Sequence, residues 1–407
     1  MCDDATRSCS IALRISPLEF FRHLTDDSSM VRGVMMAIRA LVSLMALAGC
    51  GAARSPEVSS ATKASGAGLI VWSASFVSPE VGWALGESPC STGRCLALFK
   101  TSNAGSTWVR RTLPPFTSSP WFLTATIDFA TPEDGWAYDS NESQPSGATG
   151  DQLFATHDGG RSWVSIRPRN LDKFGMSLEA LAATKSHVWA VLFSRSTDDF
   201  VIAGSPVDEN DWATVPLTLP LGAGPVTNFQ IVLSGRNGWI IDNDRGVVGG
   251  AKLKAGRWSA WSPPCTRNYG DGKLASYAPD EVLVYCSQGE YVQSPLPAAL
   301  FVSDRAGLTF RRLSASPPKN GEAVSSPMPG VIMFEAMEPV GAAIAGSFDN
   351  GKTWRTLAAF ALFNRTNWSN WGPITFVSNT EGWAVTPAGS LLRTSNGGHT
   401  WSPTRFG

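Results

Sequence analysis

Short apolar runs separated by compact polar turns repeat along residues 69–407. In the first unit, residues 69–76, 82–85, 96–101 and 108–113 have the length and composition of β-strands, and turn-forming residues lie between them. A chain with 39 Gly, 27 Pro and 16 Trp suits many tight turns and aromatic-rich sheets. The pattern therefore predicts an all-β fold built from units of four short strands.

One turn recurs as an eight-residue frame: Ser or Thr, any residue, Asp or Asn, any residue, Gly, any residue, Ser or Thr, Trp. It occurs at residues 101–108, 156–163, 347–354 and 394–401. Asp or Asn can bond local backbone amides, Gly can adopt a positive φ, and Trp opens the next strand. We assign structural roles in these turns to Asn103, Gly105, Trp108, Asp158, Gly160, Trp163, Asp349, Gly351, Trp354, Asn396, Gly398 and Trp401.

A second marker precedes the turn in most units. Gly-Trp or Val-Trp pairs end at Trp83, Trp136, Trp189, Trp239 and Trp383, and residues 282–285 and 331–334 fill this role in two further units. The aromatic residues that open the last strand of each unit are 44 to 55 residues apart: Trp108, Trp163, Trp212, Trp258, Phe310, Trp354 and Trp401. Two markers with one period predict seven equivalent units. Because a closed ring removes free sheet edges, we predict a seven-bladed β-propeller of four-stranded antiparallel blades over residues 69–407.

The repeated frame resembles the Asp-box, or bacterial neuraminidase repeat, of β-propellers. Together with the Gly-Trp pairs, it is most similar to non-catalytic propellers of the photosystem II assembly and stability factor family and to sortilin-type receptor propellers. The resemblance covers residues 69–407 and implies a binding module. The photosystem factors hold a partner through an Arg-rich patch, which has no counterpart in this sequence.

The first 68 residues differ from the repeats. Residues 1–29 look like a disordered extension from an over-long gene start, and residues 30–49 have the basic start and apolar run of a signal peptide. Leu47-Ala48-Gly49-Cys50 resembles the lipobox of bacterial lipoproteins, which implies lipid attachment at Cys50; a plain signal peptide with an incidental Cys is the alternative. Residues 50–68 are small and polar and predict a flexible tether.

Cysteine usage favours export. Beyond the first 50 residues, the sequence suggests the pairs Cys90–Cys95 across a hairpin and Cys265–Cys286 between neighbouring strands. A zinc site is the weaker alternative, because neither pair has the two-residue spacing of a metal knuckle. No pair of His has metal-binding spacing, and we expect no metal and no cofactor.

Strand alternation predicts that the turns after the first and third strands share one end of the ring. The longer connections after the second and fourth strands share the other end, where we expect binding. Trp121, Trp368 and Trp371 fall in these connections and are candidate binding residues for a sugar or a flat protein surface; burial in strands is the simpler interpretation.

Catalysis is not supported by the sequence. Sialidases of this fold use an Arg triad, a Tyr–Glu nucleophile pair and an Asp acid, and no Arg-Ile-Pro motif precedes the first frame here. Glu290 and Tyr291 are adjacent, so a strand would send them to opposite faces. A sialidase-like glycoside hydrolase stays the alternative, with Asp198 and Asp199 or Asp242 and Asp244 as its carboxylate candidates.

The net charge of −1 argues against a nucleic-acid partner. We therefore expect an extracytoplasmic, monomeric propeller, held at a bacterial membrane by a lipid alone, that binds an unidentified protein or glycan.

Overall fold

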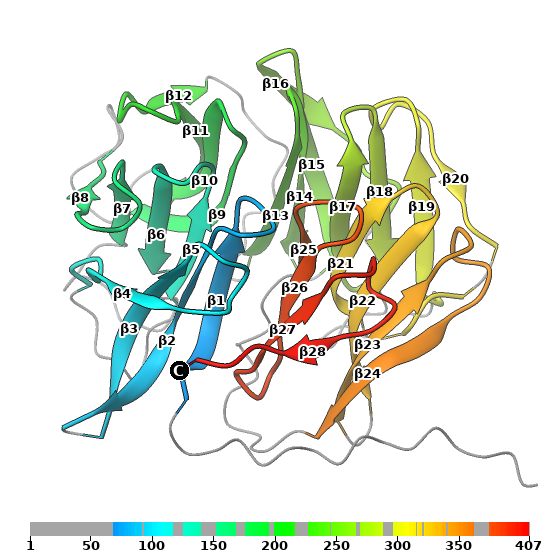
Figure 1. The fold of residues 1–407 in the computed structure, drawn as a ribbon. Helices are drawn as coiled ribbons and strands as arrows, with labels where there is room; N and C mark the ends of the chain where they lie inside the picture. Colours follow the sequence, from blue (N-terminus) through cyan, green and yellow to red (C-terminus); the bar gives the residue numbers. More distant parts are fainter. Residues whose placement is uncertain are drawn as a thin grey trace, which may run out of the picture. The chain divides into compact units, whose positions relative to one another are not determined.

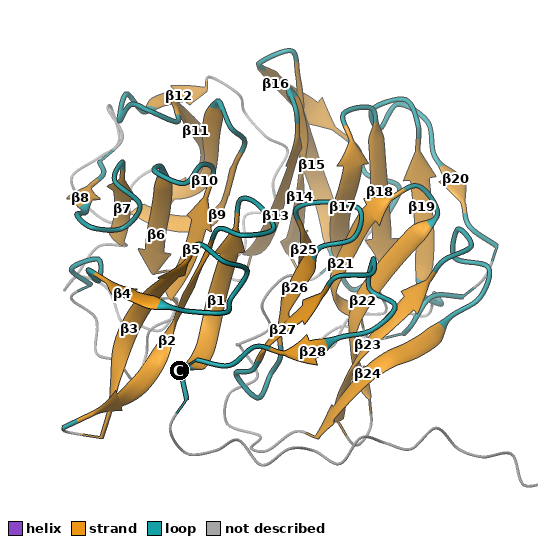
Figure 2. Cartoon of the chain, in the orientation of Figure 1, coloured by secondary structure: helices purple, strands orange, loops and turns teal. Residues whose placement is uncertain are grey.

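Residues 68–91, 93–116, 125–139, 152–167, 176–194, 199–215, 227–244, 246–265, 269–287, 296–314, 316–319, 321–338, 341–361 and 374–406 are described by the structure, a computed structural model. All of them belong to one unit of the chain, residues 59–407. In this part of the chain every strand belongs to one of seven four-stranded antiparallel sheets, as the sequence predicts (Figures 1 and 2).

Each sheet, or blade, is built from four strands that are consecutive in sequence. The strands are β1 (Ile70–Phe76), β2 (Gly82–Cys90), β3 (Gly93–Thr101), β4 (Val109–Arg111); β5 (Ala125–Phe129), β6 (Gly135–Asp139), β7 (Gln152–Thr156), β8 (Val164–Ser165); β9 (Met176–Ala183), β10 (His187–Ser194), β11 (Asp199–Pro206), β12 (Ala213–Val215); β13 (Thr227–Ser234), β14 (Asn237–Asp244), β15 (Val247–Lys254), β16 (Arg257–Trp261); β17 (Gly272–Ala278), β18 (Glu281–Cys286), β19 (Ala299–Ser303), β20 (Arg311–Arg312); β21 (Gly321–Met328), β22 (Val331–Glu338), β23 (Gly341–Ser347), β24 (Arg355–Ala361); β25 (Thr375–Phe376), β26 (Gly382–Val385), β27 (Leu391–Thr394) and β28 (Ser402–Pro403).

The apolar markers of the sequence form the core between blades. Trp83, Trp136, Trp239 and Trp383 are almost fully buried in the second strands of their blades. Trp83 stacks on Phe129 of the next blade, with ring centroids 3.6 Å apart. A large flat side chain on each second strand thus fills the space between two sheets, which a single blade cannot bury alone.

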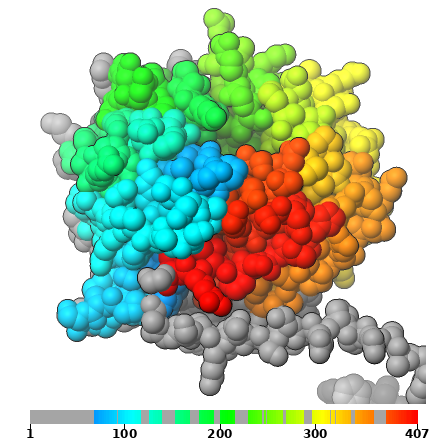
Figure 3. All heavy atoms as spheres, in the orientation of Figure 1, coloured from blue at the N-terminus to red at the C-terminus, as the bar shows by residue number. Residues whose placement is uncertain are grey.

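The ring closes where blade 1 (β1–β4) meets blade 7 (β25–β28), which lie side by side in Figures 1 and 3. Phe76 of β1 stacks on Trp383 of β26 with ring centroids 3.7 Å apart. Val71 N donates a hydrogen bond to Gly389 O at 2.8 Å. Blade 7 takes all four of its described strands from the C-terminal end of the chain. Closure therefore uses side-chain packing and single hydrogen bonds across the seam, without strand exchange among the described strands.

The antiparallel order gives the ring two ends. We call the end with the turns after the first and third strands the turn end, and the opposite one the loop end. Both predicted disulfides are present: Cys90–Cys95 links β2 to β3, and Cys265–Cys286 links the residues after β16 to the end of β18. By strand order, both lie at the loop end.

Candidate binding site

The four repeated turns share one hydrogen-bond pattern. In residues 156–163, Thr156 Oγ1 accepts a hydrogen bond from Gly160 N at 2.9 Å and donates one to Asp158 Oδ1 at 2.8 Å. Asp158 Oδ1 also accepts the backbone N–H of Ser162 at 2.9 Å. Gly160 has φ 83°, which residues with a Cβ rarely adopt. Equivalent bonds surround Asn103, Asp349 and Asn396. The polar side chains of the frame thus stabilise their own turn by hydrogen bonds to its backbone.

These bonds keep the turn carboxylates charged. Hydrogen bonds from the hydroxyl and backbone of Thr353 lower the pKa of Asp349 to about 2. Burial alone would raise the pKa of Asp158, but hydrogen bonds, chiefly from Ser162, outweigh it and lower this pKa to about 2. Because a general acid needs a pKa near the working pH, these two carboxylates are unsuited to that role.

Each of the four repeated turns, and the equivalent turn at residues 303–310, also bonds to the first turn of its own blade, which agrees with the prediction that both markers lie at one end of the ring. The donors are backbone N–H groups, the acceptors are backbone carbonyls, and the distances are 2.7–3.0 Å. The pairs are Ala104 with Glu80, Gly159 with Glu133, Ala306 with Asp280, Asn350 with Gly330, and Gly397 with Thr380.

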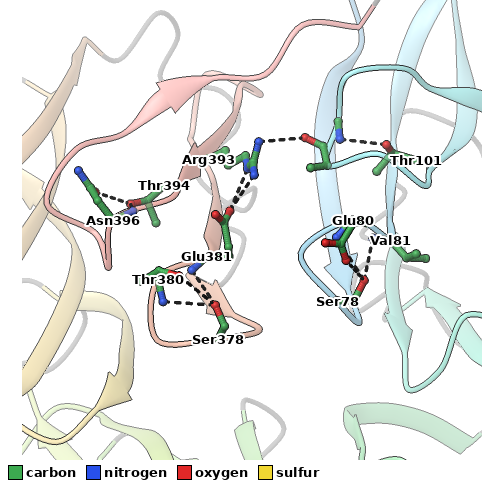
Figure 4. Close-up of polar contacts among 12 residues, drawn as sticks. Ser78, Glu80, Val81, Thr101, Ser378, Thr380, Glu381, Arg393, Thr394 and Asn396 are labelled. Atoms are coloured by element: carbon green, nitrogen blue, oxygen red, sulfur yellow. Dashed lines mark hydrogen bonds and ion pairs between the residues drawn. The ribbon is translucent and has the colours of Figure 1, made fainter.

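Neighbouring blades are joined at the turn end as well. Trp83 Nε1 donates to Gly159 O at 3.1 Å. Lys100 Nζ lies 4.5 Å from the Trp83 ring centroid and donates to Pro132 O at 2.8 Å. At the seam, Arg393 binds the Glu381 carboxylate at 2.9 Å and Ala104 O at 3.5 Å, between blade 7 and the blade 1 turn that contains Thr101 (Figure 4). Many polar groups of the turn end therefore hold the ring together.

The inner strands are linked through side chains. Ser73 Oγ accepts Ile127 N at 3.1 Å, and Ser75 Oγ accepts Phe129 N at 2.9 Å, which joins β1 to β5. Asp128 Oδ2 on β5 accepts Ala183 N of β9 at 3.1 Å. Gln230 of β13 accepts Leu274 N of β17 in the same way. These side chains satisfy backbone donors on the inner edge of the following blade.

Among these inner-strand side chains, Asp128 is the one that changes its charge near neutral pH. Burial raises the pKa of Asp128 to about 7, although hydrogen bonds from Ala183 N and the Ser75 hydroxyl favour the charged form. Burial, and then the nearby Asp128, raise the pKa of Tyr138 on β6. The repeat pattern does not single out Asp128, although it is the lone carboxylate in the apolar segment 125–130.

Further charged residues occupy the first and second strands of several blades. Glu179 of β9, Lys273 of β17 and Glu322 of β21 are half-buried, and Lys273 and Glu322 are the second residues of their strands. Glu335 on β22 is 2% exposed, and burial, followed by the charge of Glu322, raises its pKa well above the usual value.

The sequence-predicted site residues have different outcomes. The disulfide cysteines are paired as predicted. Cys50, Trp121, Trp368 and Trp371 lie outside the described residues. Of the carboxylate candidates for hydrolysis, Asp242 has 0% exposure within blade 4 (β13–β16), which does not suit a residue that must meet a substrate.

Among the described residues, no group of three or more His, Cys, Asp and Glu side chains could hold a metal ion. The described part of the chain also has no helix with the length and apolar character needed to cross a bilayer.

Comparison with known proteins identifies the fold alone. No family model matches the sequence, and no curated protein sequence matches it. Among solved structures, YCF48 bound to a D1 peptide is 18% identical with a TM-score of 0.51, and the match covers 81% of this chain and 94% of that chain. YCF48 from Cyanidioschyzon merolae is 15% identical with a TM-score of 0.53, and coverage is 81% and 96%. A prolyl endopeptidase structure is 12% identical with a TM-score of 0.50, and coverage is 93% and 55%.

Proposed function

We propose that this chain is an exported, lipid-anchored, non-catalytic β-propeller that binds a protein or glycan partner at the cell envelope. The observation that carries this proposal is that the two ends of the ring differ in how their polar groups and connections are used. At the turn end, side chains of the repeated frame form hydrogen bonds within their own turns, and Trp83, Lys100 and Arg393 bond to backbone carbonyls of neighbouring blades. The loop end carries both disulfides and the longer connections, which are the usual places for binding residues.

Two further observations support the proposal. Disulfides persist in oxidising compartments, which agrees with export. A solved propeller of similar fold, YCF48, is bound to a D1 peptide, so a ring of this kind can hold a polypeptide. The apolar run at residues 30–49 and Cys50 provide the proposed export signal and lipid site.

Site-specific photocrosslinking in cells tests where a partner binds. A photoreactive residue at Ser91, exposed between β2 and β3, samples the loop end, and one at Lys352, exposed in the turn before β24, is the matched control. We expect a discrete adduct from Ser91 and none from Lys352. Adducts from Lys352 alone would place the binding surface at the wrong end and contradict the proposal.

A glycan and glycoside screen, read for binding and turnover together, tests the choice of partner and the absence of catalysis. Binding without turnover supports a glycan partner, whereas turnover of any glycoside would overturn the non-catalytic assignment.

The proposed lipid anchor is tested separately. A Cys50→Ala change should move the protein from the membrane fraction to the soluble fraction, and unchanged membrane association would refute lipid attachment at Cys50.

A further inference from the structure

The outermost strands of the blades carry charge of one sign. On the described fourth strands (β4, β8, β12, β16, β20, β24 and β28), every charged residue is an arginine: Arg110, Arg111, Arg257, Arg311, Arg312 and Arg355. The whole chain has 33 Lys and Arg and 34 Asp and Glu, so neither sign is in clear excess. Charge of either sign protects an edge strand from pairing with other chains. Edge protection therefore explains the charge on these strands but not its sign.

The fourth strands and the repeated turns meet along the rim of the turn end. Thr112 N, just after β4, donates a hydrogen bond to Gly160 O in the next blade's turn at 3.1 Å. In the same way, Trp261 Nε1 at the end of β16 donates to Gly307 O in the turn of blade 5 (β17–β20) at 2.9 Å. β16 and β20 lie at the periphery of the ring (Figure 1). The last hairpin of blade 4, the turn at residues 303–310 and β20 thus form one path, which we call the outer path.

Exposed basic residues follow the outer path: Lys254, Arg257, Arg305, Arg311 and Arg312. Lys254 and Arg257 are directly opposite each other in the β15–β16 ladder, and like charges so placed destabilise a sheet. Arg305 occupies the position at which the repeated frame has Asp or Asn. Because these residues come from two blades, the sequence alone shows no cluster of them.

The five basic side chains of the outer path have no ion pair and no side-chain hydrogen bond with any described residue. Other basic residues of the turn end are bound: Lys100 donates to Pro132 O, and Arg393 binds the Glu381 carboxylate. Asp304, next to Arg305, is the one exposed acidic residue on the described outer path. The outer path is therefore a positively charged surface whose donors are free for a ligand.

From its sign, exposure and free donors, we propose that the outer path binds a linear polymer that carries phosphate groups along its length. An Arg guanidinium can bind a phosphate through two parallel N–H···O bonds, which a compact ammonium group cannot do. β16 alone spans about 14 Å at 3.4 Å per residue. The path is thus longer than one phosphate and suits a chain of them.

A flat anionic surface fits the turn end less well than a narrow chain does. The first turns at this end expose the carboxylates of Glu80, Glu133 and Asp280. A bilayer of anionic lipids that covered this end would meet them with like charge, whereas a chain along the rim avoids them. A nucleic acid also fits less well, because its bases stack on displayed aromatic rings, and Trp258 and Trp261 of β16 are buried.

Binding of long-chain inorganic polyphosphate to the purified full chain, measured by titration calorimetry at several salt concentrations, tests the proposal. The variant is Arg311→Ser with Arg312→Ser. Its matched control, Lys185→Ser with Arg236→Ser, removes the same charge from exposed first turns at the same end. We expect the control to bind like the wild type, and the variant to bind at least about tenfold more weakly, with a smaller salt dependence.

Two further variants separate binding from folding. Arg257→Ser with Arg305→Ser changes other residues of the same path and should weaken binding similarly. Arg311→Lys with Arg312→Lys keeps the charge and should recover part of the lost affinity.

No binding by the wild type at low salt, or equal losses in the variant and its control, would overturn the proposal. Tighter binding of a single-stranded oligonucleotide than of polyphosphate would assign the outer path to nucleic acid and would also overturn it. The third contrary result is a preference for anionic over neutral lipid vesicles that disappears in the Arg311→Ser, Arg312→Ser variant, because it would assign the path to a membrane surface.

Discussion

Single hydroxyl groups organise the repeated turns. Thr156 is 1% exposed, and its Oγ1 accepts the buried N–H of Gly160 while it donates to Asp158. Thr156→Val keeps the shape but leaves that N–H without its acceptor, so we expect a loss of about 1–3 kcal/mol in the free energy of unfolding. Thr156→Ser should restore most of it, because Ser347 serves in the equivalent turn. Denaturant unfolding of the two variants measures the difference, and equal losses in both would show that the hydroxyl is not the cause.

A second residue-scale prediction concerns pH. Asp128 ionises at about pH 7 in the folded chain and at an ordinary pKa of 3.8 when unfolded. Between these values the folded state holds a proton that the unfolded state has lost, so stability falls as pH rises from about 4 to about 7. A difference of this size between the folded and unfolded pKa corresponds to about 4 kcal/mol. Because Asp128 is only half-buried, we expect the free energy of unfolding to fall by about 1–2 kcal/mol.

Asp128→Asn removes this titration and retains an oxygen that can accept Ala183 N. We therefore expect the variant to be more stable than the wild type at pH 8 and similar to it at pH 4, as measured by chemical unfolding at both values. Asp208→Asn, an exposed position, is the control and should show no such pH-dependent gain. A pH profile of Asp128→Asn that parallels the wild type would contradict the assigned role.

At the scale of elements, the two disulfides differ in loop length and burial. Cys265 and Cys286 are 5% and 0% exposed and 21 residues apart in sequence, whereas Cys90 and Cys95 are half-buried and five residues apart. The chain-entropy model gives about 3 kcal/mol for the longer loop and about 2 kcal/mol for the shorter one. Replacing both cysteines of a pair by Ala should thus destabilise the chain more at Cys265–Cys286, and mild reductant should open Cys90–Cys95 first. Mass spectrometry after thiol labelling measures the order, and the reverse order would refute it.

Strand boundaries show how far sequence patterns predict elements. The eight-residue frame and the Gly-Trp pairs predicted seven blades, because each marker sits at a tight turn where few residues fit. The second strand was predicted to end at Leu85 but continues to Cys90, since β2 and β3 extend as one hairpin to the Cys90–Cys95 link. No local pattern marks such an extension.

The candidate site was harder to predict than the fold. Asp128 and Gln230 form hydrogen bonds to residues of neighbouring blades, which are 55 and 44 residues away in sequence. The spacing of the repeats predicts the blades, but it does not predict which side chain links one blade to the next. The predicted Trp121, Trp368 and Trp371 lie outside the described residues and stay predictions. Residues fixed by a local turn were thus predictable, and residues fixed by inter-blade geometry were not.

At the scale of the whole molecule, the seam between blades 1 and 7 is the place where no covalent connection supports the ring. Phe76 on Trp383 spans the seam, and Phe129 on Trp83 makes the same stack between blades 1 and 2, which the chain itself connects. Phe76→Ala and Phe129→Ala remove equivalent buried rings, so each should destabilise the chain by about 3–5 kcal/mol.

The two variants should differ in where the structure opens. In Phe76→Ala the seam retains the Val71–Gly389 hydrogen bond, the Arg393 contacts and the rest of the apolar cluster between blades 1 and 7. None of these contacts is covalent, so they can break together, and hydrogen exchange should rise locally in β1, β26 and β27. In Phe129→Ala the chain connection between blades 1 and 2 keeps them adjacent, so exchange should rise only near the lost ring. Similar exchange maps for both variants would mean that the ring opens as readily within the chain as at its seam, and that closure does not limit its stability.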